Sequence, residues 1–188
     1  MTDAARPGTG SAGAQPGATE LARIRLLLTD VDGVLTDGRI HFDHTGQEWK
    51  SFHVHDAAGI VYWHRAGGLS GFLSGRSARV VSERADELGV HEVHLGHLDK
   101  LPVFEEIVAR RELEPAEVAY VGDDLLDLPI LRRVGFAVAP ADARPEIRER
   151  VHHVTGAAGG FGVIREVVEL LLGARGLWDE VVAKGGRP

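Results

Sequence analysis

Five aspartates lie just after two apolar runs of the chain: Asp30 and Asp32 after residues 24–29, and Asp123, Asp124 and Asp127 after residues 118–121. Carboxylates this close together repel one another, so either one of them holds a proton or a cation lies between them. Oxygen ligands of this kind favour a hard divalent ion, and Mg²⁺ is the ion we expect. The pattern therefore indicates a metal site, and an anionic small molecule stays possible as a ligand because the metal would supply the counter-charge that it needs.

Two other interpretations of the string DVDG that begins at Asp30 are a calcium-binding loop and a solvated turn. An EF-hand loop needs flanking helices and a glutamate at its twelfth position, where this chain has His41. The apolar run before Asp30 and the longer string DVDGVLTDG favour a functional site over a simple turn.

A hydroxyl group and a lysine could add binding groups for a phosphoryl oxygen. Ser74, Gly75 and Arg76 follow the apolar run 69–73, where a hydroxyl and free backbone N–H groups can form a phosphate cradle. Lys100 begins a predicted helix, and its ammonium group could neutralise phosphoryl charge. Each feature also has a simpler explanation, because SGR is common in loops and a lysine at a helix start is usually solvated. The acidic cluster after residue 121 could likewise cap the helix that follows it.

Short apolar runs alternate with helical patterns along the chain, and this alternation predicts a parallel sheet with helices on both faces. We expect strands at residues 24–29, 69–73, 90–95, 118–121 and 136–139, and helices at 77–88, after Asp99 and around 163–171. Parallel strands bind ligands where their carboxyl ends meet. We therefore expect the residues that follow these strands to converge in space.

Residues 38–52 interrupt this alternation. Ile40 and Phe42 precede a turn at residues 43–46, and extended-looking residues follow it, which predicts a β-hairpin inserted after the first strand. Its apolar side chains would be exposed in a single chain, so we expect the hairpin to contact another subunit.

Composition excludes several classes of protein. Twenty-one basic against 28 acidic residues give a net charge of −7, which disfavours a nucleic-acid partner. Cysteine is absent, which excludes disulfides and thiol chemistry. No apolar run is long enough to span a membrane and no signal pattern begins the chain, so we expect a cytoplasmic protein with no membrane partner. We expect residues 1–20 to form a disordered tail and residues 21–184 a single domain.

The order of the motifs, DxD, then Ser74, then Lys100, then GDDxxD, resembles the four motifs of haloacid dehalogenase-type phosphatases. Forty-one residues separate Asp32 from Ser74, and 25 separate Ser74 from Lys100. These gaps leave no room for a folded cap domain beyond the hairpin, so the chain is similar to the capless members.

More closely, the chain resembles the 3-deoxy-D-manno-octulosonate 8-phosphate (KDO 8-phosphate) phosphatase family. The matching stretches are LLLTDVDGVLTDG, the hairpin with its GQE, FHVHDAAGI, SGRSARVVSERADELGV, LDKL, VAYVGDDLLDLPIL and GGFGVIREVVELLL. The resemblance implies a Rossmann-like α/β fold with a flanking hairpin, a homotetramer, Mg²⁺ as cofactor, a sugar-phosphate substrate and a place in lipopolysaccharide biosynthesis.

The resemblance also implies roles for individual residues. Asp30 would be the nucleophile that becomes an aspartyl-phosphate, and Asp32 the acid and base that serves the leaving oxygen and then the water. Ser74 and Lys100 would hold the transferring group. The Mg²⁺ ligands would be Asp30, the backbone carbonyl of Asp32 and Asp123, supported by Asp124 and Asp127. Substrate contacts would come from His53, Val54, His55, Asp56, Ala57, Gly75, Arg76, Arg84 and Lys100.

This sequence departs from the family pattern in the substrate segment, where His55 replaces an arginine, Ala57 a glycine, and Val61 a residue that is often basic. Ser74 replaces a threonine and keeps the hydroxyl. Fewer guanidinium groups weaken the pairing of a sugar-acid carboxylate. Two alternatives to KDO 8-phosphate hydrolysis therefore stay open: hydrolysis of a nonulosonate 9-phosphate, and a non-catalytic Mg²⁺-binding scaffold.

Overall fold

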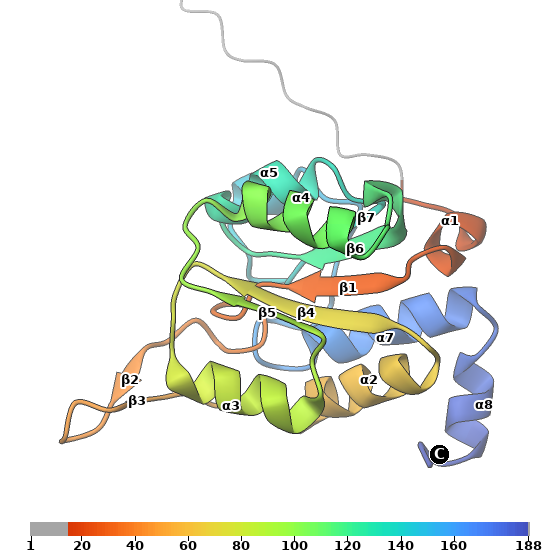
Figure 1. Ribbon diagram of the computed structural model, residues 1–188. Coiled ribbons are helices and arrows are strands. Elements are labelled where there is room, and N and C mark those ends of the chain that lie inside the picture. Colours follow the sequence, from red (N-terminus) through yellow and green to blue (C-terminus); the bar gives the residue numbers. More distant parts are fainter. Residues whose placement is uncertain (1–14, 188) are drawn as a thin grey trace, which may run out of the picture.

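The computed structural model describes residues 15–187, and its centre is a six-stranded sheet in which all neighbouring strands are parallel (Figure 1). Across the sheet the strands are β5 (Glu92–Leu95), β4 (Leu69–Ser74), β1 (Leu26–Thr29), β6 (Val118–Val121), β7 (Phe136–Ala139) and β8 (His153–Val154). β1, β6 and β7 are buried at every position, as expected of strands covered on both faces. The predicted parallel sheet is confirmed, and the structure has a sixth strand, β8, that the sequence analysis did not predict.

Helices cover both faces of this sheet, with α2, α3 and α7 on one face and α4 and α5 on the other (Figure 1). The helices are α1 (Ala18–Ala22), α2 (Val54–Arg65), α3 (Arg79–Leu88), α4 (Lys100–Arg110), α5 (Leu128–Leu131), α6 (Pro145–Arg148), α7 (Val163–Ala174) and α8 (Trp178–Ala183), with 3₁₀ turns η1 (Pro115–Glu117) and η2 (Leu125–Asp127). The predicted Rossmann-like α/β fold with helices on both faces is confirmed.

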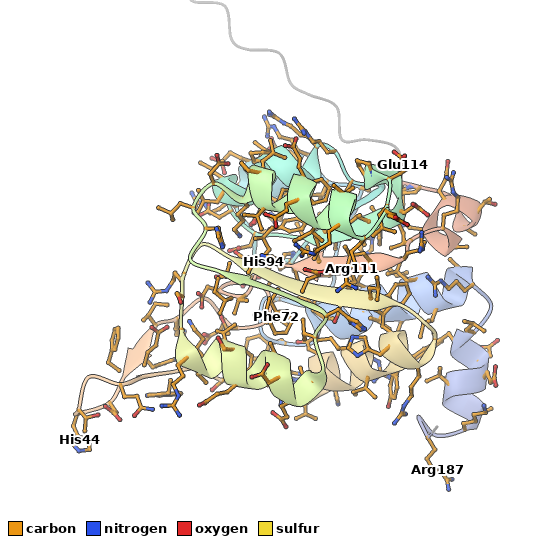
Figure 2. The ribbon with its side chains drawn as sticks, viewed as in Figure 1. His44, Phe72, His94, Arg111, Glu114 and Arg187 are labelled. Carbon is orange, nitrogen blue, oxygen red and sulfur yellow. The ribbon has the colours of Figure 1, made fainter. Side chains whose placement is uncertain are left out.

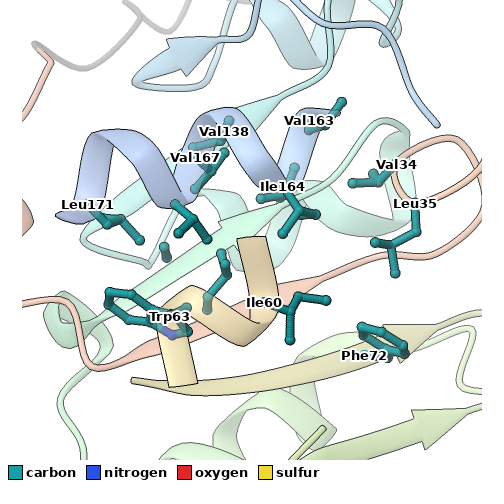
Figure 3. Close-up of a cluster of buried hydrophobic side chains, with 14 of the residues drawn as sticks. Val34, Leu35, Ile60, Trp63, Phe72, Val138, Val163, Ile164, Val167 and Leu171 are labelled. Carbon is teal, nitrogen blue, oxygen red and sulfur yellow. The ribbon is translucent and has the colours of Figure 1, made fainter. Parts of the chain in front are cut away.

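Each face of the sheet has its own apolar core. The α7 stripe, which includes Ile164, Val167 and Leu171, packs with Ile60 and Trp63 of α2 (Figure 3). On the opposite face, Phe104 and Ile107 of α4 pack with Ile130 of α5. These two layers cover both faces of the sheet whose strand ends carry the predicted site residues.

The ends of the elements differ in places from the sequence prediction. The first strand begins at Leu26 rather than residue 24, and the helix expected from residue 77 begins at Arg79. The helix α2 was not predicted, because its apolar positions are mixed with four strongly polar ones, two of which are histidines. Gly89 ends α3 in the left-handed conformation with φ 65°, as its position after the helix predicts.

The predicted tail needs a correction. Residues 1–14 of that tail lie outside the described residues, but residues 18–20 belong to α1 and are not disordered. Two interactions explain the helix: the backbone N–H of Gly17 donates to Glu20 Oε2 at 2.5 Å, and Leu21 is buried in the core beside α7.

The predicted hairpin is present as β2 (His41–Phe42) and β3 (Glu48–Trp49), a separate antiparallel pair. It projects from the body of the molecule with His44 at its tip (Figures 1 and 2). Asp43 Oδ1 orders the turn by accepting from the backbone N–H groups of Thr45 at 2.8 Å and Gln47 at 2.9 Å. Phe42 and Trp49 are exposed, as the sequence predicted for a single chain.

None of the helices in residues 15–187 is long and apolar enough to cross a membrane. The cytoplasmic location stays a prediction.

Candidate active site

Three neighbouring strands deliver the predicted site residues to one edge of the sheet. β4, β1 and β6 lie side by side, and Asp30 follows β1, Ser74 ends β4 and Asp123 comes two residues after β6. Because the strands are parallel, their carboxyl ends meet at this edge. The predicted convergence is therefore present for these three residues.

Three buried or half-buried carboxylates form one group at this edge. Asp30, Asp123 and Asp127 each offer an oxygen within 4.8 Å of the others. Burial, and then the charge of Asp127, raise the pKa of Asp30 to about 7, although Lys100 opposes the shift. Burial, and then the charges of Asp30 and Asp127, raise the pKa of Asp123 to about 8. Several carboxylates so close together in a partly buried place are stabilised in their ionised forms by a bound cation, so this group could hold a metal ion.

Lys100 supplies one positive charge to the group. Its buried ammonium lies 3.0 Å from Asp30 Oδ1 and 2.6 Å from Asp127 Oδ1. Burial acts to lower the pKa of Lys100, but the carboxylates of Asp127 and Asp30 outweigh burial and raise it. Lys100 is therefore charged at neutral pH, as a group that neutralises a phosphoryl oxygen must be.

Asp127 is fully engaged by hydrogen bonds. Its Oδ1 accepts from Tyr120 Oη at 2.6 Å as well as from Lys100, and its Oδ2 accepts from the backbone N–H groups of Asp123 at 3.0 Å and Asp124 at 3.2 Å. The side chain of Asp124 lies outside the acidic group and accepts from Leu125 N at 2.7 Å. Asp127 thus organises the loop after β6, and the oxygens of the acidic group that accept no hydrogen bond within residues 15–187 belong to Asp30 and Asp123. Tyr120 is a buried part of this arrangement that the sequence analysis did not identify.

The backbone conformation and surroundings of Gly33 explain why the residue after Asp32 is a glycine. Its φ is +90°, and a Cβ at this position would lie 2.2 Å from Asp123 Oδ2. Only glycine lets the two acidic loops approach this closely. On the other side of the loop, a Cβ on Gly159 would lie 2.0 Å from Gly33 O, so the GGFG segment before α7 supports the same backbone. Sequence analysis gave GGFG no such role.

Asp32 points away from the acidic group and toward the hairpin. Its Oδ1 pairs with the ammonium of Lys50, just after β3, and its Oδ2 lies 3.7 Å from Nε of Arg76. Glu48 of β3 pairs with the same two cations, and its hydrogen bond with Lys50 lowers the pKa of Glu48. Neither Glu48 nor Lys50 was predicted as a site residue; the signal available in the sequence was a pair of opposite charges, i and i+2, in the hairpin.

The residues of the predicted phosphate cradle lie at the end of β4, and their role in binding phosphate stays a prediction. Ser74 is buried, and its Oγ accepts from the backbone N–H of Arg76 at 3.2 Å. Gly75 lies close to Leu126 and Leu98, 3.4 and 3.6 Å from its would-be Cβ, so loops after β6 and β5 border this turn. The exposed guanidinium of Arg76 faces Asp32 and Glu48 rather than solvent alone.

The predicted substrate segment starts α2. His53 caps the helix and accepts from His55 N at 3.3 Å, while Val54 and His55 are exposed. Asp56 differs from the expectation of a substrate contact. Its Oδ1 accepts from Arg165 N at 3.0 Å and its Oδ2 from Gly162 N at 3.3 Å, so the carboxylate satisfies free N–H groups in the first turn of α7.

Arg84 of α3 lies near this segment. It lines the same small cavity as His53 and Ala57, and its guanidinium lies 5.8 Å from the ring centre of Phe52. A second partner, Glu87 Oε2, lies 2.6 Å from its Nη1. Arg84 and the substrate segment are thus brought together, and both lie beside Leu35 of the loop that carries Asp32.

Comparison with known proteins gives one consistent result. Residues 85–167 match the model of the haloacid dehalogenase-like hydrolase family. The chain is 43% identical over 167 residues to 3-deoxy-D-manno-octulosonate 8-phosphate phosphatase KdsC of Salmonella typhi, with 89% of this chain and 88% of the relative covered. The Yersinia pestis 3-deoxy-D-manno-octulosonate 8-phosphate phosphatase superposes with a TM-score of 0.84 at 40% identity, covering 86% of this chain and 88% of that one. The Moraxella catarrhalis enzyme, solved with a magnesium ion, a phosphate ion and KDO, superposes with a TM-score of 0.87 at 34% identity, covering 89% and 97%.

Proposed function

This chain belongs to the 3-deoxy-D-manno-octulosonate 8-phosphate phosphatase family and is a phosphoric monoester hydrolase, and we propose that Asp30 is the nucleophile with which it hydrolyses that sugar phosphate. The observation that carries this proposal is the position of Asp30 between the ammonium of Lys100, at 3.0 Å, and the other carboxylates of the acidic group. Val31 N and Lys100 both hold Oδ1 of Asp30, and none of the residues in the described range donates a hydrogen bond to Oδ2. We assign the attack to Oδ2.

The residues of the acidic group fit a divalent cation. Burial, and then the neighbouring carboxylates, raise the pKa values of two of the three carboxylates toward neutrality, and a bound divalent cation would favour their ionised forms. We propose Mg²⁺, held by Asp30, Asp123 and the backbone carbonyl of Asp32, with Asp127 and Asp124 in support. The presence of magnesium in the Moraxella catarrhalis relative supports this choice. The bound ion would neutralise charge on the phosphoryl oxygens.

The reaction that we propose has two steps. In the first, a bond forms between Asp30 and phosphorus while the bond from phosphorus to the sugar oxygen breaks, and Asp32 gives its proton to that oxygen. In the second, Asp32 takes a proton from a water molecule, the water oxygen bonds to phosphorus, and the bond to Asp30 breaks. Ser74 and Lys100 hold the oxygens of the transferring group throughout, because phosphoryl transfer depends mainly on positioning and charge neutralisation.

We propose that the sugar binds over the start of α2, near His53, Val54, His55 and Ala57, with Arg76 and Arg84 beside it. Gly75 supplies backbone at the phosphate end. Asp56 would not contact the sugar, because both its oxygens accept hydrogen bonds from backbone N–H groups at the start of α7. It would instead join α2 to α7 and so stabilise the surface on which the sugar binds.

We further propose that residues 21–184 work as one domain and that four copies assemble. Large apolar side chains remain exposed around the site and on the hairpin, notably Phe42, Trp49, Leu98, Leu125 and Phe161. Such side chains gathered on one end of a monomer are typical of an interface. A neighbouring subunit would cover the site, since residues 15–187 contain no cap domain.

A phosphate-release assay over a panel of substrates tests this function. The panel contains KDO 8-phosphate, a nonulosonate 9-phosphate and neutral sugar phosphates, each with Mg²⁺ and with a chelator. We expect the highest kcat/KM for KDO 8-phosphate and no release in the chelator. A higher kcat/KM for the nonulosonate 9-phosphate would make that compound the substrate. If no member of the panel releases phosphate, the alternative of a non-catalytic Mg²⁺-binding scaffold would be favoured.

A further inference from the structure

A lysine with a fully buried side chain lies beside the proposed acid and base of the reaction. Lys50 has a side-chain exposure of 0%, and its ammonium pairs with Oδ1 of Asp32. The same ammonium lies 2.9 Å from Oε1 of Glu48. A buried ammonium is costly unless it is paired, and Lys50 is paired on both sides.

Lys50 belongs to a closed arrangement of four charges, here called the charged ring: Asp32, Glu48, Lys50 and Arg76. Arg76 closes the ring, because its Nη2 lies 3.1 Å from Oε2 of Glu48 and its Nε lies 3.7 Å from Oδ2 of Asp32. Each acid therefore lies between the two bases. The ring joins the loop after β1, the turn after β4 and the hairpin, which are separate segments of the chain.

The two bases of the ring differ in exposure. The side chain of Arg76 is 47% exposed, whereas that of Lys50 is 0% exposed. An anionic substrate can attract Arg76 away from Asp32, because Arg76 lies at the surface and its contact with Asp32 is long. Lys50 has no such freedom, since it is enclosed by protein and held by Glu48. Lys50 is thus the fixed partner of Asp32.

The second oxygen of Asp32 is left for chemistry. Oδ2 is buried and has no hydrogen-bond partner among residues 15–187. A buried carboxylate oxygen without a donor is uncommon in a folded protein and calls for an explanation. With Oδ1 held by Lys50, the orientation of the carboxylate is fixed. Oδ2 lies 3.7 Å from Nε of Arg76 and becomes available to a proton on the substrate or on water when the substrate attracts Arg76 away.

We propose that Lys50 is a positioning residue for Asp32: by holding Oδ1 it presents Oδ2 to the leaving oxygen of the sugar and then to the attacking water. Glu48 keeps Lys50 in place. This inference rests on the proposed role of Asp32 as acid and base. It gives the hairpin a second role beyond subunit contact, because Glu48 lies in its returning strand β3 and Lys50 directly follows that strand.

The dependence on the leaving group tests this role. A sugar oxygen needs a proton as it leaves, whereas 4-nitrophenolate leaves without one. In Lys50→Met we therefore expect kcat/KM for KDO 8-phosphate to fall by roughly a hundredfold, within the range for loss of general acid catalysis. We expect kcat/KM for 4-nitrophenyl phosphate to change by less than about tenfold, because formation of the aspartyl-phosphate does not need Asp32 for this substrate.

The second step of the reaction gives an independent signature. Hydrolysis of the aspartyl-phosphate needs Asp32 as a base for either substrate. Rapid mixing of Lys50→Met with 4-nitrophenyl phosphate should therefore release a burst of about one nitrophenolate per active site, followed by slow turnover. Lys50→Arg, which keeps the charge, should restore most of the activity on the sugar phosphate.

Three comparisons separate the possible outcomes. Equal losses on both substrates without a burst would mean that Lys50 is merely structural, and would overturn the inference. If Asp32→Asn shows the leaving-group effect and Lys50→Met does not, the inference fails while the proposed function stands. If Asp32→Asn itself shows no leaving-group effect, the proposed role of Asp32 fails instead.

Two further variants guard against misfolding. The double variant Lys50→Met with Glu48→Gln removes the carboxylate that Lys50→Met alone would leave without its buried partner, and the same leaving-group effect is expected in it. Arg133→Met removes a cation from an exposed pair with Glu105, away from the site, and should leave both substrates unaffected. Unfolding temperatures of all variants are measured alongside.

Discussion

The ammonium of Lys100 lies 3.0 Å from Oδ1 of Asp30, although 69 residues separate them in the sequence. Asp30 follows the central strand β1 and Lys100 is the first residue of α4, after the edge strand β5. The contact therefore depends on the order of strands β5, β4 and β1 in the sheet. It places a permanent positive charge beside the proposed nucleophile.

Replacing the nucleophile should abolish turnover. In Asp30→Asn an amide replaces the carboxylate that attacks phosphorus, so we expect phosphate release to fall by roughly a thousandfold or more. Phosphate release from KDO 8-phosphate measures the effect. The unfolding temperature in a chelator should not fall, because burial already raises the pKa of Asp30 to about 7 and disfavours its charged form. Activity within about tenfold of the parent protein would contradict the assignment.

Stability without metal should decrease as the pH rises. The folded-state pKa values of about 7 for Asp30 and about 8 for Asp123 lie above the ordinary value of 3.8, so the folded protein binds more protons than the unfolded one between these limits. The free energy of unfolding therefore falls over this range as these groups lose their protons. Urea unfolding in a chelator at about pH 5 and about pH 8 measures the slope.

Mg²⁺ should reverse this trend, because the ion binds the ionised carboxylates and so binds the folded protein more tightly at higher pH. We expect a larger stabilisation by millimolar Mg²⁺ at about pH 8 than at about pH 5. Asp123→Asn is the control and should reduce both the slope and the stabilisation. A stabilisation by Mg²⁺ that is the same at both pH values in the parent protein would contradict the assignment of the acidic group as the metal site.

Removing one buried hydroxyl should loosen the site. Tyr120→Phe deletes the donor at 2.6 Å from Asp127 Oδ1, which also holds Lys100. We expect a loss of about 1.5–3 kcal/mol in the free energy of unfolding, the range for a hydrogen bond to a charged group. We expect kcat to fall by about tenfold, as for other residues that orient a catalytic group. Tyr62→Phe is the matched control, since the Tyr62 hydroxyl makes no hydrogen bond within residues 15–187. An equal loss of stability in both variants would argue against the Asp127 contact.

The hairpin should control assembly rather than folding. Phe42 and Trp49 are 61% and 46% exposed, so Phe42→Ser combined with Trp49→Ser should change the unfolding of a single chain little. Light scattering should show a tetramer for the parent protein and a smaller species for the double variant. Val154→Ser on the edge strand β8 is an exposed apolar control. A monomeric parent protein at micromolar concentration would refute the tetramer.

Much of the fold follows from local patterns in the sequence. Residues 118–121 and 136–139 are short apolar runs with turn residues at their ends, and each forms the strand that the pattern predicts. The stripe around Ile164 and Val167 forms the buried face of α7. Such elements are predictable because the period of the apolar residues itself selects strand or helix. The start of α1 and the whole of α2 were less predictable, because these depend on what they pack against.

The sequence by itself determined which residues we propose to carry the chemistry. Asp30, Asp32 and Asp123 each follow an apolar run, and this placement indicates a metal site before any coordinates are known. Together with Ser74 and Lys100, they stand in an order that resembles the motifs of haloacid dehalogenase-type phosphatases, and this resemblance implies the phosphatase activity. This works because parallel strands must bring their carboxyl ends to one edge. Local sequence therefore fixes the membership of this part of the site.

Only the tertiary structure decided how those residues are oriented and what supports them. In the tertiary structure Asp32 forms an ion pair with Lys50 after the hairpin strand β3. Asp56 accepts a hydrogen bond from the backbone of the first turn of α7, and Tyr120 donates one to Asp127. None of these contacts has a local sequence pattern, because each joins residues on different elements or on opposite sides of a loop. A charged side chain finds its partner through the packing of the whole chain, and sequence spacing alone does not specify that packing.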